Sequence, residues 1–366
     1  MVDMKKEALI VKQFEFQLSG GLSSPAEMSF FTELVRKVRV LHADDDYPLL
    51  VHCSQEAKTG LYIGLSILLE EASSRECVNV AKCVEKIRKK RPQLIRTERE
   101  YGILYEALDE ALKIEAYLCK KESLKKKLET KMDIIAEEYQ RIKKRLMKAE
   151  SNESGLQTKD SLTHGLTGSA GFHILDGYAR ASQFIIGSAL TEHQMEAFWK
   201  MVCSKNIKVI VMLEFQTAGC IPDSDKTSIT LDDIVIERTT SESNELIQLV
   251  ELIVNGRSVN LMIVNNWADG ELDGQPDYNS LLYYLRVVES QIQGDTKGTI
   301  CVIESERLGT ARFFVAAYNA IEKVRAELLV NVYGAVLAVQ SKDSISHFSL
   351  EDYLYLYNLL LFSTSA

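Results

Sequence analysis

The chain has 366 residues, of which 46% are hydrophobic and 26% charged, and these ordinary globular proportions allow two domains. The formal net charge of −9 argues against nonspecific binding of nucleic acid, although the charges could still be arranged to leave a local basic face. Because no apolar run reaches the roughly 18 to 20 residues of a transmembrane helix and no signal-peptide pattern opens the chain, we expect a soluble protein.

The first part of the chain, from Met1 to about Leu118, alternates short apolar runs with helical stretches. Its most informative segment is 49–64, with the sequence LLVHCSQEAKTGLYIG. The order of an apolar run, a short polar loop and a helical pattern predicts a strand, an anion-sized loop and a helix N-terminus. Cys53 would then lie at the end of the strand and face helix N–H groups, where a thiolate and an oxyanion are both favoured.

Cys53 has two interpretations at this point. A free cysteine most often acts as a small buried hydrophobe, whereas a place beside a helix N-terminus favours a nucleophile. The seven cysteines of the chain lack the paired spacing of a zinc site or a disulfide scaffold. We therefore expect a reducing compartment, and neither a metal ion nor a cofactor.

The middle of the chain, residues 120–150, is a helical pattern rich in lysine and glutamate without proline or glycine. Charge pairs four residues apart favour a solvated linker helix. The alternative is a partner-binding coiled coil, for which the apolar positions are sparse. Residues 151–169 supply the serine, asparagine, glycine and threonine of a flexible connection.

After this connection, residues 196–202 predict a helix and residues 207–213 a buried strand. Trp267-Ala268-Asp269 lies in a predicted loop. Residues 299–310 predict a second strand and loop, and an apolar helix follows from Phe313.

The segment around Cys53 resembles the phosphate-binding loop of the cysteine-dependent protein tyrosine phosphatases, which runs Val-His-Cys, five residues, then Arg-Thr-Gly. Downstream, residues 90–92 and 96–101 resemble the Arg-Pro turn and the glutamine-bearing loop of that family. The resemblance implies that Cys53 is the nucleophile. It also implies a substrate-binding loop made of His52, Ser54, Lys58, Thr59 and Gly60, in which Lys58 stands where the family has arginine.

The family pattern returns after residue 169. Residues 267–269 resemble the mobile Trp-Pro-Asp loop, and residues 299–310 stand where a second phosphate loop belongs. Two such domains in series resemble the cytoplasmic region of receptor-type tyrosine phosphatases. The resemblance implies an α/β fold, a twisted mixed sheet flanked by helices, in tandem and with the first copy incomplete. We expect boundaries at 1–118 for the first copy, 119–168 for the charged helical linker and flexible connection, and 169–366 for the degenerate second copy.

The chemistry of that family needs a thiolate, an arginine, a general acid and a glutamine around one phosphorus atom. In the first copy only Cys53 remains. The loop is one residue short, and Lys58 lacks the bidentate fork of arginine. Gly21 stands at the general-acid position, and Arg96 and Glu100 replace the glutamines.

The second copy lacks the complementary parts. Asp269 keeps the general-acid position, but Glu304 replaces the nucleophile and Thr310 replaces the arginine. Phe348 and Asp352 stand at the glutamine positions. Without a nucleophile beside it, we expect Asp269 to be idle.

These substitutions favour a pseudophosphatase that acts as a regulatory or scaffold module. Its partners would be phosphotyrosine proteins or a phosphatase or kinase of a signalling pathway, and it would lie in the cytoplasm, as the cytoplasmic part of a membrane receptor. Two alternatives stay open. One is a residual tyrosine phosphatase with Cys53 as nucleophile and Lys58 as a weak anion ligand. The other is a phosphotyrosine-binding module without hydrolysis, against which the carboxylate of Glu56 argues.

Overall fold

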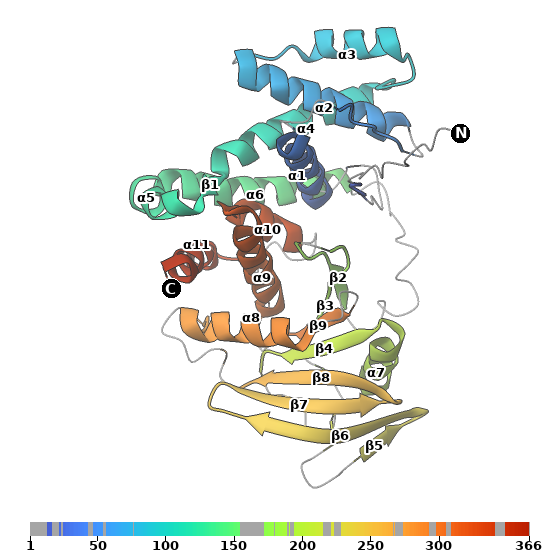
Figure 1. Cartoon of the computed structure of the whole chain (residues 1–366), viewed down its shortest axis with the longest axis vertical. Helices are drawn as coiled ribbons and strands as arrows, with labels where there is room; N and C mark the ends of the chain where they lie inside the picture. The colour runs from blue at the N-terminus through green and yellow to red at the C-terminus, as the bar shows by residue number, and fades with distance from the viewer. Residues whose placement is uncertain are drawn as a thin grey trace, which may run out of the picture. The chain divides into compact units, whose positions relative to one another are not determined.

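The computed structural model describes residues 13–16, 22, 25–42, 47–53, 56–75, 77–153, 172–178, 180–188, 190, 194–214, 221–222, 228–265, 267, 274–292, 298–304, 309–340 and 348–365. The chain divides into two compact units, residues 1–116 and 117–366 (Figure 1). Each unit has its own hydrophobic core and is described by itself.

The described part of the first unit is helical. Its helices are α1 (Pro25–His42), α2 (Glu56–Arg75), α3 (Val80–Lys90) and α4 (Glu98–Tyr117), blue to teal in Figure 1. Their apolar faces meet in one core, with Leu65, Leu68 and Leu104 fully buried. Gly60 lets α2 approach the turn after α3, since a Cβ atom there would lie 3.1 Å from side-chain atoms of Leu94 and Ile95.

The strand predicted ahead of Cys53 does not form. Residues 47–53 have no regular secondary structure, and Tyr47 and Leu50 are 77% and 86% exposed. A strand needs neighbouring strands to complete its backbone hydrogen bonds, and the described residues of the first unit include none. The prediction was wrong because an apolar run can specify a strand only where a sheet receives it.

The second unit is built on a mixed sheet, whose described strands lie in the order β2-β3-β9-β4-β8-β7-β6-β5. The central strands β3, β9, β4 and β8 are parallel, and the others pair antiparallel. Buried parallel strands rich in valine and isoleucine are typical of sheets covered on both faces. The mixed sheet that the fold class predicted is confirmed. The bounds are β2 (His173–Leu175), β3 (Phe184–Gly187), β4 (Ile207–Met212), β5 (Ser228–Leu231), β6 (Ile234–Ser243), β7 (Ile247–Val254), β8 (Arg257–Val264) and β9 (Thr299–Ile303).

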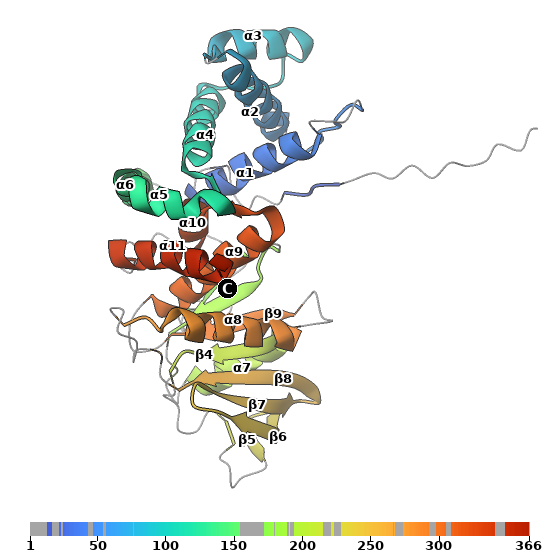
Figure 2. The ribbon, with the colours of Figure 1, turned by 60° about the vertical axis from the view of Figure 1, so that its left-hand side comes forward.

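Helices cover this sheet. On one face Phe198 and Trp199 of α7 pack in a core cluster with Ile210 and Met212 of β4, and α8 lies beside β4 in both Figure 1 and Figure 2. The predicted helix at 196–202 and strand at 207–213 are confirmed as α7 and β4, and the helix predicted from residue 313 begins at 310 as α9. The bounds are α7 (Met195–Ser204), α8 (Tyr278–Ile292), α9 (Thr310–Glu327), α10 (Val332–Val339) and α11 (Leu350–Ser365).

The charged stretch after residue 117 belongs to this second unit. It forms β1 (Cys119–Lys120), which pairs with β10 (Leu329–Val330), the 3-10 turn η1 (Lys121–Ser123), α5 (Leu124–Thr130) and α6 (Met132–Glu153). Leu124 and Ile135 are fully buried. The interpretation as a solvated linker was therefore wrong for α5 and α6, because each turns one face into the core of the unit.

A buried ion pair lies on that inward face. The Lys127 ammonium donates to Glu138 Oε1 at 2.6 Å, with side chains 5% and 0% exposed. Tyr353 and Tyr357 of α11 donate to Glu138 Oε2 at 2.8 and 2.6 Å. Lys127 also donates to the carbonyl oxygen of Tyr117 at 2.7 Å. The network ties α5, α6 and α11 together.

Asp277 caps the N-terminus of α8, and its carboxylate accepts from the backbone N–H groups of Asn279 at 3.0 Å and Ser280 at 3.2 Å. We expect Asp277→Ala to lower the free energy of unfolding by about 0.5–2 kcal/mol at neutral pH, as measured by chemical denaturation. Burial raises the pKa of Asp277, but hydrogen bonds from Ser280 and Asn279 outweigh it and leave the pKa below its usual range.

The lowered pKa fixes the sign of the pH dependence. The cap contributes fully above the unfolded-state pKa of about 3.9, and its contribution is lost as the pH falls through the folded-state pKa. The stabilities of the wild type and of Asp277→Ala should therefore converge in acid. Asp277→Asn, which keeps an acceptor oxygen without a titrating group, is the control. Equal stability of Asp277→Ala and wild type at neutral pH would contradict the capping role.

Candidate functional site

The described residues around Cys53 differ in their exposure to solvent. His52 and Cys53 are exposed, Lys58 is half-buried, and Thr59 and Gly60 are buried in the first turns of α2. Ser54 lies outside the described residues. α2 begins at Glu56, so the cysteine precedes a helix N-terminus as predicted, but from an irregular segment instead of a strand end.

The predicted glutamine position at Glu100 has a structural role. Glu100 Oε2 accepts from the backbone N–H of Arg96 at 2.6 Å and of Thr97 at 3.4 Å. In return Thr97 Oγ1 accepts from the backbone N–H of Glu100 at 3.1 Å. This reciprocal arrangement is a capping box at the start of α4, so the carboxylate is engaged with the backbone. The side chain of Arg96 is exposed.

The second unit repeats this cap at the start of α11. Asp352 Oδ2 accepts from the backbone N–H of Ser349 at 2.9 Å, and Ser349 Oγ accepts from the backbone N–H of Asp352 at 3.0 Å. The other carboxylate oxygen accepts from Gln275 Nε2 at 2.8 Å. Phe348 is buried against Phe313, with ring centroids 5.8 Å apart. Glu100 and Asp352, at corresponding positions of the two predicted copies, thus both use their carboxylates in helix caps.

Sequence reasoning missed both caps, although the signal was present. A serine or threonine three residues before an acidic side chain, ahead of an apolar helical pattern, is the sequence signature of a capping box. Thr97 to Glu100 and Ser349 to Asp352 both fit it.

The two predicted general-acid positions, Gly21 and Asp269, lie outside the described residues. Trp267 is described and is 1% exposed. Its ring packs against Tyr284 of α8 and against Phe313 and Phe314 of α9, at centroid distances of 6.3, 6.5 and 6.4 Å. The tryptophan of the predicted Trp-Pro-Asp-like segment is therefore a core residue.

Glu304 lies at the carboxyl end of the central strand β9. Its backbone N–H donates to the carbonyl of Gly187 in β3 at 2.8 Å. Its Oε2 accepts from the backbone N–H of Gly309 at 3.1 Å, and its Oε1 lies 3.9 Å from Nη1 of Arg312. The Glu304 and Arg312 side chains are only 9% and 7% exposed.

This geometry brings an anion to the N-terminus of α9. Gly309, the residue before the helix, has φ of +91°, which favours glycine. Unpaired N–H groups and the helix dipole favour negative charge at such a terminus. Thr310, at the predicted arginine position, is the first residue of α9 and is 1% exposed. The anion position is thus occupied by a carboxylate of the chain itself.

Cys301, three residues before Glu304, is too deeply buried to act as a nucleophile in its place. Cys301 lies inside β9 in the cluster under α7, and burial raises the pKa of its thiol far above the usual range. Cys53 and Glu304 belong to different units.

Among the described residues, no group of three or more histidine, cysteine or acidic side chains could hold a metal ion. No helix of the described chain combines the length and apolarity that crossing a bilayer requires.

The comparisons with known proteins agree with this repeated arrangement. The family model described as protein-tyrosine phosphatase matches residues 2–110 and 172–362. The chain is 24% identical over 409 residues to the receptor-type tyrosine-protein phosphatase epsilon of Rattus norvegicus, covering 98% of this chain and 58% of that protein. It is 21% identical over 403 residues to the alpha protein of Mus musculus, covering 98% and 48%. The chain thus spans about half the length of these curated relatives.

Proposed function

The chain belongs to the protein-tyrosine phosphatase family, and from this premise we propose that it is a pseudophosphatase: a member that has lost hydrolysis and acts as a regulatory or scaffold module. In this proposal residues 1–118 and 169–366 derive from two phosphatase domains, with residues 119–168 between them. The module would work in the cytoplasm with phosphotyrosine proteins or another signalling protein, as the receptor-type relatives suggest.

The observation that carries the proposal is the carboxylate of Glu304. A glutamate in place of the cysteine offers no thiolate to attack phosphorus. Its charge also repels a phosphate dianion from the N-terminus of α9, where Gly309 and Arg312 already face that carboxylate. Both effects oppose substrate binding and turnover in the second unit.

The first unit supports the same conclusion through what surrounds Cys53. Lys58 is a point charge without the bidentate fork that binds two phosphate oxygens. Glu100 is engaged in the cap of α4. Losing one preorganised charge-stabilising donor typically costs about 10²–10³ in rate, and losing a general acid about 10²–10⁴. These losses need not multiply, but the smaller values alone would leave little turnover.

Hydrolysis of a small aryl phosphate by the purified full chain tests the proposal, with Cys53→Ser as the matched control. We expect the wild type and Cys53→Ser to release phosphate equally slowly, at the rate of the buffer. Turnover that disappears in Cys53→Ser would overturn the proposal in favour of a residual phosphatase with Cys53 as nucleophile.

Titration with a phosphotyrosine peptide then separates a scaffold from a non-hydrolysing phosphotyrosine-binding module. A scaffold that does not use the cysteine loop should bind the phosphorylated and the unphosphorylated peptide equally, with no saturable binding that depends on the phosphate. Saturable binding that Lys58→Ala abolishes would favour the phosphotyrosine-binding module.

A further inference from the structure

Positive charge gathers between Lys82 and Arg96 in an otherwise acidic chain. This stretch holds seven cationic side chains against one carboxylate, Glu85, a local charge of +6. Since the whole chain carries −9, the remaining residues carry −15. We call the seven residues the α3 basic surface, and all of them are exposed. They are Lys82, Lys86, Arg88, Lys89, Lys90, Arg91 and Arg96.

The α3 basic surface is held in place by the opposite side of the helix. Val80, Cys83, Val84 and Ile87 of α3 are buried in the core of the first unit. Arg88 Nε donates to the carbonyl oxygen of Ile95 at 2.9 Å, which ties the end of α3 to the turn before α4. Five of the seven cations therefore project from an anchored helix, and Arg91 and Arg96 lie in the segment between α3 and α4.

Only some of the seven cations of the α3 basic surface can be explained by a stabilising effect on the helix. Cationic side chains in a last helical turn interact favourably with the dipole. Lys82 and Lys86 line a hollow shared with Glu70, Glu71 and Arg75 of α2, so the two carboxylates offset only part of the positive charge there. The four consecutive cations 88–91 and Arg96 carry more positive charge than the partial negative charge of one helix C-terminus can balance.

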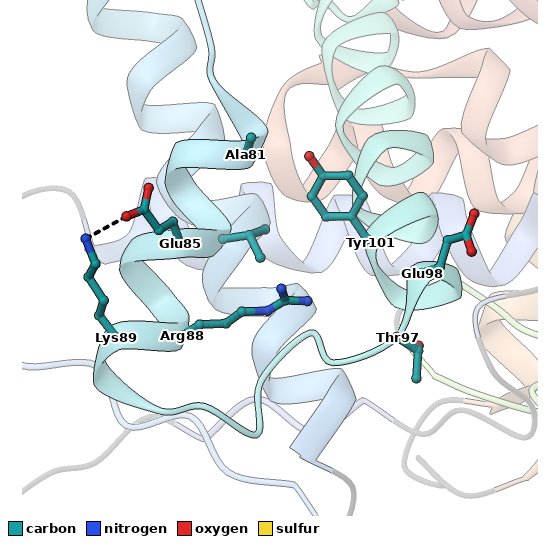
Figure 3. Close-up of a pocket in the computed structure, with 8 residues that line it drawn as sticks. Ala81, Glu85, Arg88, Lys89, Thr97, Glu98 and Tyr101 are labelled. Carbon is teal, nitrogen blue, oxygen red and sulfur yellow. Dashed lines mark ion pairs between the residues drawn. The ribbon is translucent and has the colours of Figure 1, made fainter.

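A groove of about 650 Å³ adjoins these cations (Figure 3). One wall is α3, where Lys89 pairs with Glu85 at 2.6 Å, and the other is the first turn of α4. Tyr101 faces the groove from α4 (Figure 3) and packs edge-on against Tyr105, with ring centroids 5.3 Å apart. The lining of the groove thus combines an apolar and aromatic wall with two cations, Arg88 and Lys89, and two carboxylates, Glu85 and Glu98. The surplus positive charge comes from neighbouring cations of the α3 basic surface.

We infer that the α3 basic surface and its groove bind an acidic segment of another protein. An extended segment would place an aromatic or apolar side chain beside Tyr101 and Val84. Its carboxylates would lie over the cations 88–91 and Arg96. This complementarity of charge also raises the rate at which the two proteins associate. A flat anionic bilayer fits less well, because a planar surface has no single projecting side chain to enter the groove between α3 and α4. Of the seven cations only Arg96 stands at a position that the family resemblance assigns to the phosphatase site, so the inference does not depend on whether the chain hydrolyses phosphate.

Fluorescence anisotropy of the full chain with a short labelled peptide, rich in glutamate and with one central phenylalanine, tests the inference. The charge-reversed variant is Lys90→Glu with Arg96→Glu. Its matched control is Lys125→Glu with Lys126→Glu on α5, which makes the same change in net charge at exposed positions of the other unit. We expect the first variant to weaken binding about tenfold at low salt and the control to leave it nearly unchanged.

Two further measurements complete the test. Binding by the wild type should weaken as salt is added, because exposed charges are screened, and Tyr101→Ala should weaken it without changing the salt dependence. Equal losses in both charge-reversed variants would overturn the inference, since they would show an effect of net charge alone. Binding to phosphatidylserine vesicles with no binding to the peptide would also overturn it, in favour of a membrane surface.

Discussion

Replacing Lys127 with methionine is expected to lower the free energy of unfolding by about 3–5 kcal/mol, the usual cost of removing one partner of a buried ion pair. The fully buried carboxylate of Glu138 would keep its hydrogen bonds from Tyr353 and Tyr357 but lose the Lys127 ammonium, which lies 2.6 Å from its Oε1. Burial raises the pKa of Glu138 already in the wild type, and Lys127 opposes that effect. Chemical denaturation at neutral pH measures the loss.

The pH dependence of this loss has a definite sign. Without Lys127 the pKa of Glu138 should rise further. Because its folded-state pKa then lies above the unfolded-state value of about 4.3, stability is lost as the pH rises from the unfolded-state pKa to the folded-state pKa. The deficit of Lys127→Met should therefore shrink as the pH is lowered toward 4.3. Lys126→Met, on the exposed side of the same helix, should cost less than about 0.5 kcal/mol. A loss of similar size in both variants would refute a special role for the buried pair.

Much of the second unit could be predicted from its sequence, because its local patterns agree with the packing around them. The run from Ile207 to Met212 is a strand since both faces of the parallel sheet are covered, which a continuous apolar run indicates. Residues 313–324 read as an apolar helix because α9 is buried on nearly every side. These are positions where propensity, pattern and burial point the same way.

The failures have a common physical cause, since each depended on a partner that local sequence does not specify. Residues 49–53 have the composition of a strand but no sheet neighbour in the described part of their unit. The lysine and glutamate pattern of α5 and α6 looked solvated because Lys127 and Glu138 are eleven positions apart, beyond the spacing of a helical pair. Only the fold shows that they meet.

The candidate site also has features that the sequence predicted and features that only the fold shows. The family followed from aligned motifs and is confirmed, whereas the replacement of the nucleophile by Glu304 stays a prediction from the same motifs. The family resemblance identifies Glu100 and Asp352 only as replacements of the family's glutamines, whereas the three-residue spacings to Thr97 and Ser349 indicate helix caps. The contact between Glu304 and Arg312 had no sequence signal, because a residue after a strand and a residue eight positions later in a helix meet only in the folded chain.

Replacing Glu304 with alanine should have the second largest effect. The Gly309 N–H would lose its charged acceptor and Arg312 a nearby carboxylate, which should lower the free energy of unfolding by about 1.5–3 kcal/mol, the range for a hydrogen bond to a charged group. Glu304→Gln, which keeps an acceptor oxygen without the charge, should lose less. Thermal and chemical unfolding of the full chain compare the three proteins.

Inorganic phosphate gives that prediction a sharper form. With Glu304 removed, an external anion could take the position of the carboxylate at the start of α9. Phosphate at about 100 times its dissociation constant would then restore about 2.7 kcal/mol to Glu304→Ala, while the wild type, whose position is filled, should gain nothing beyond the general effect that sulfate and phosphate have on protein stability. If phosphate stabilised both proteins equally, Glu304 could not be the occupant of the anion position, and the charge argument for an inactive second unit would fail with it.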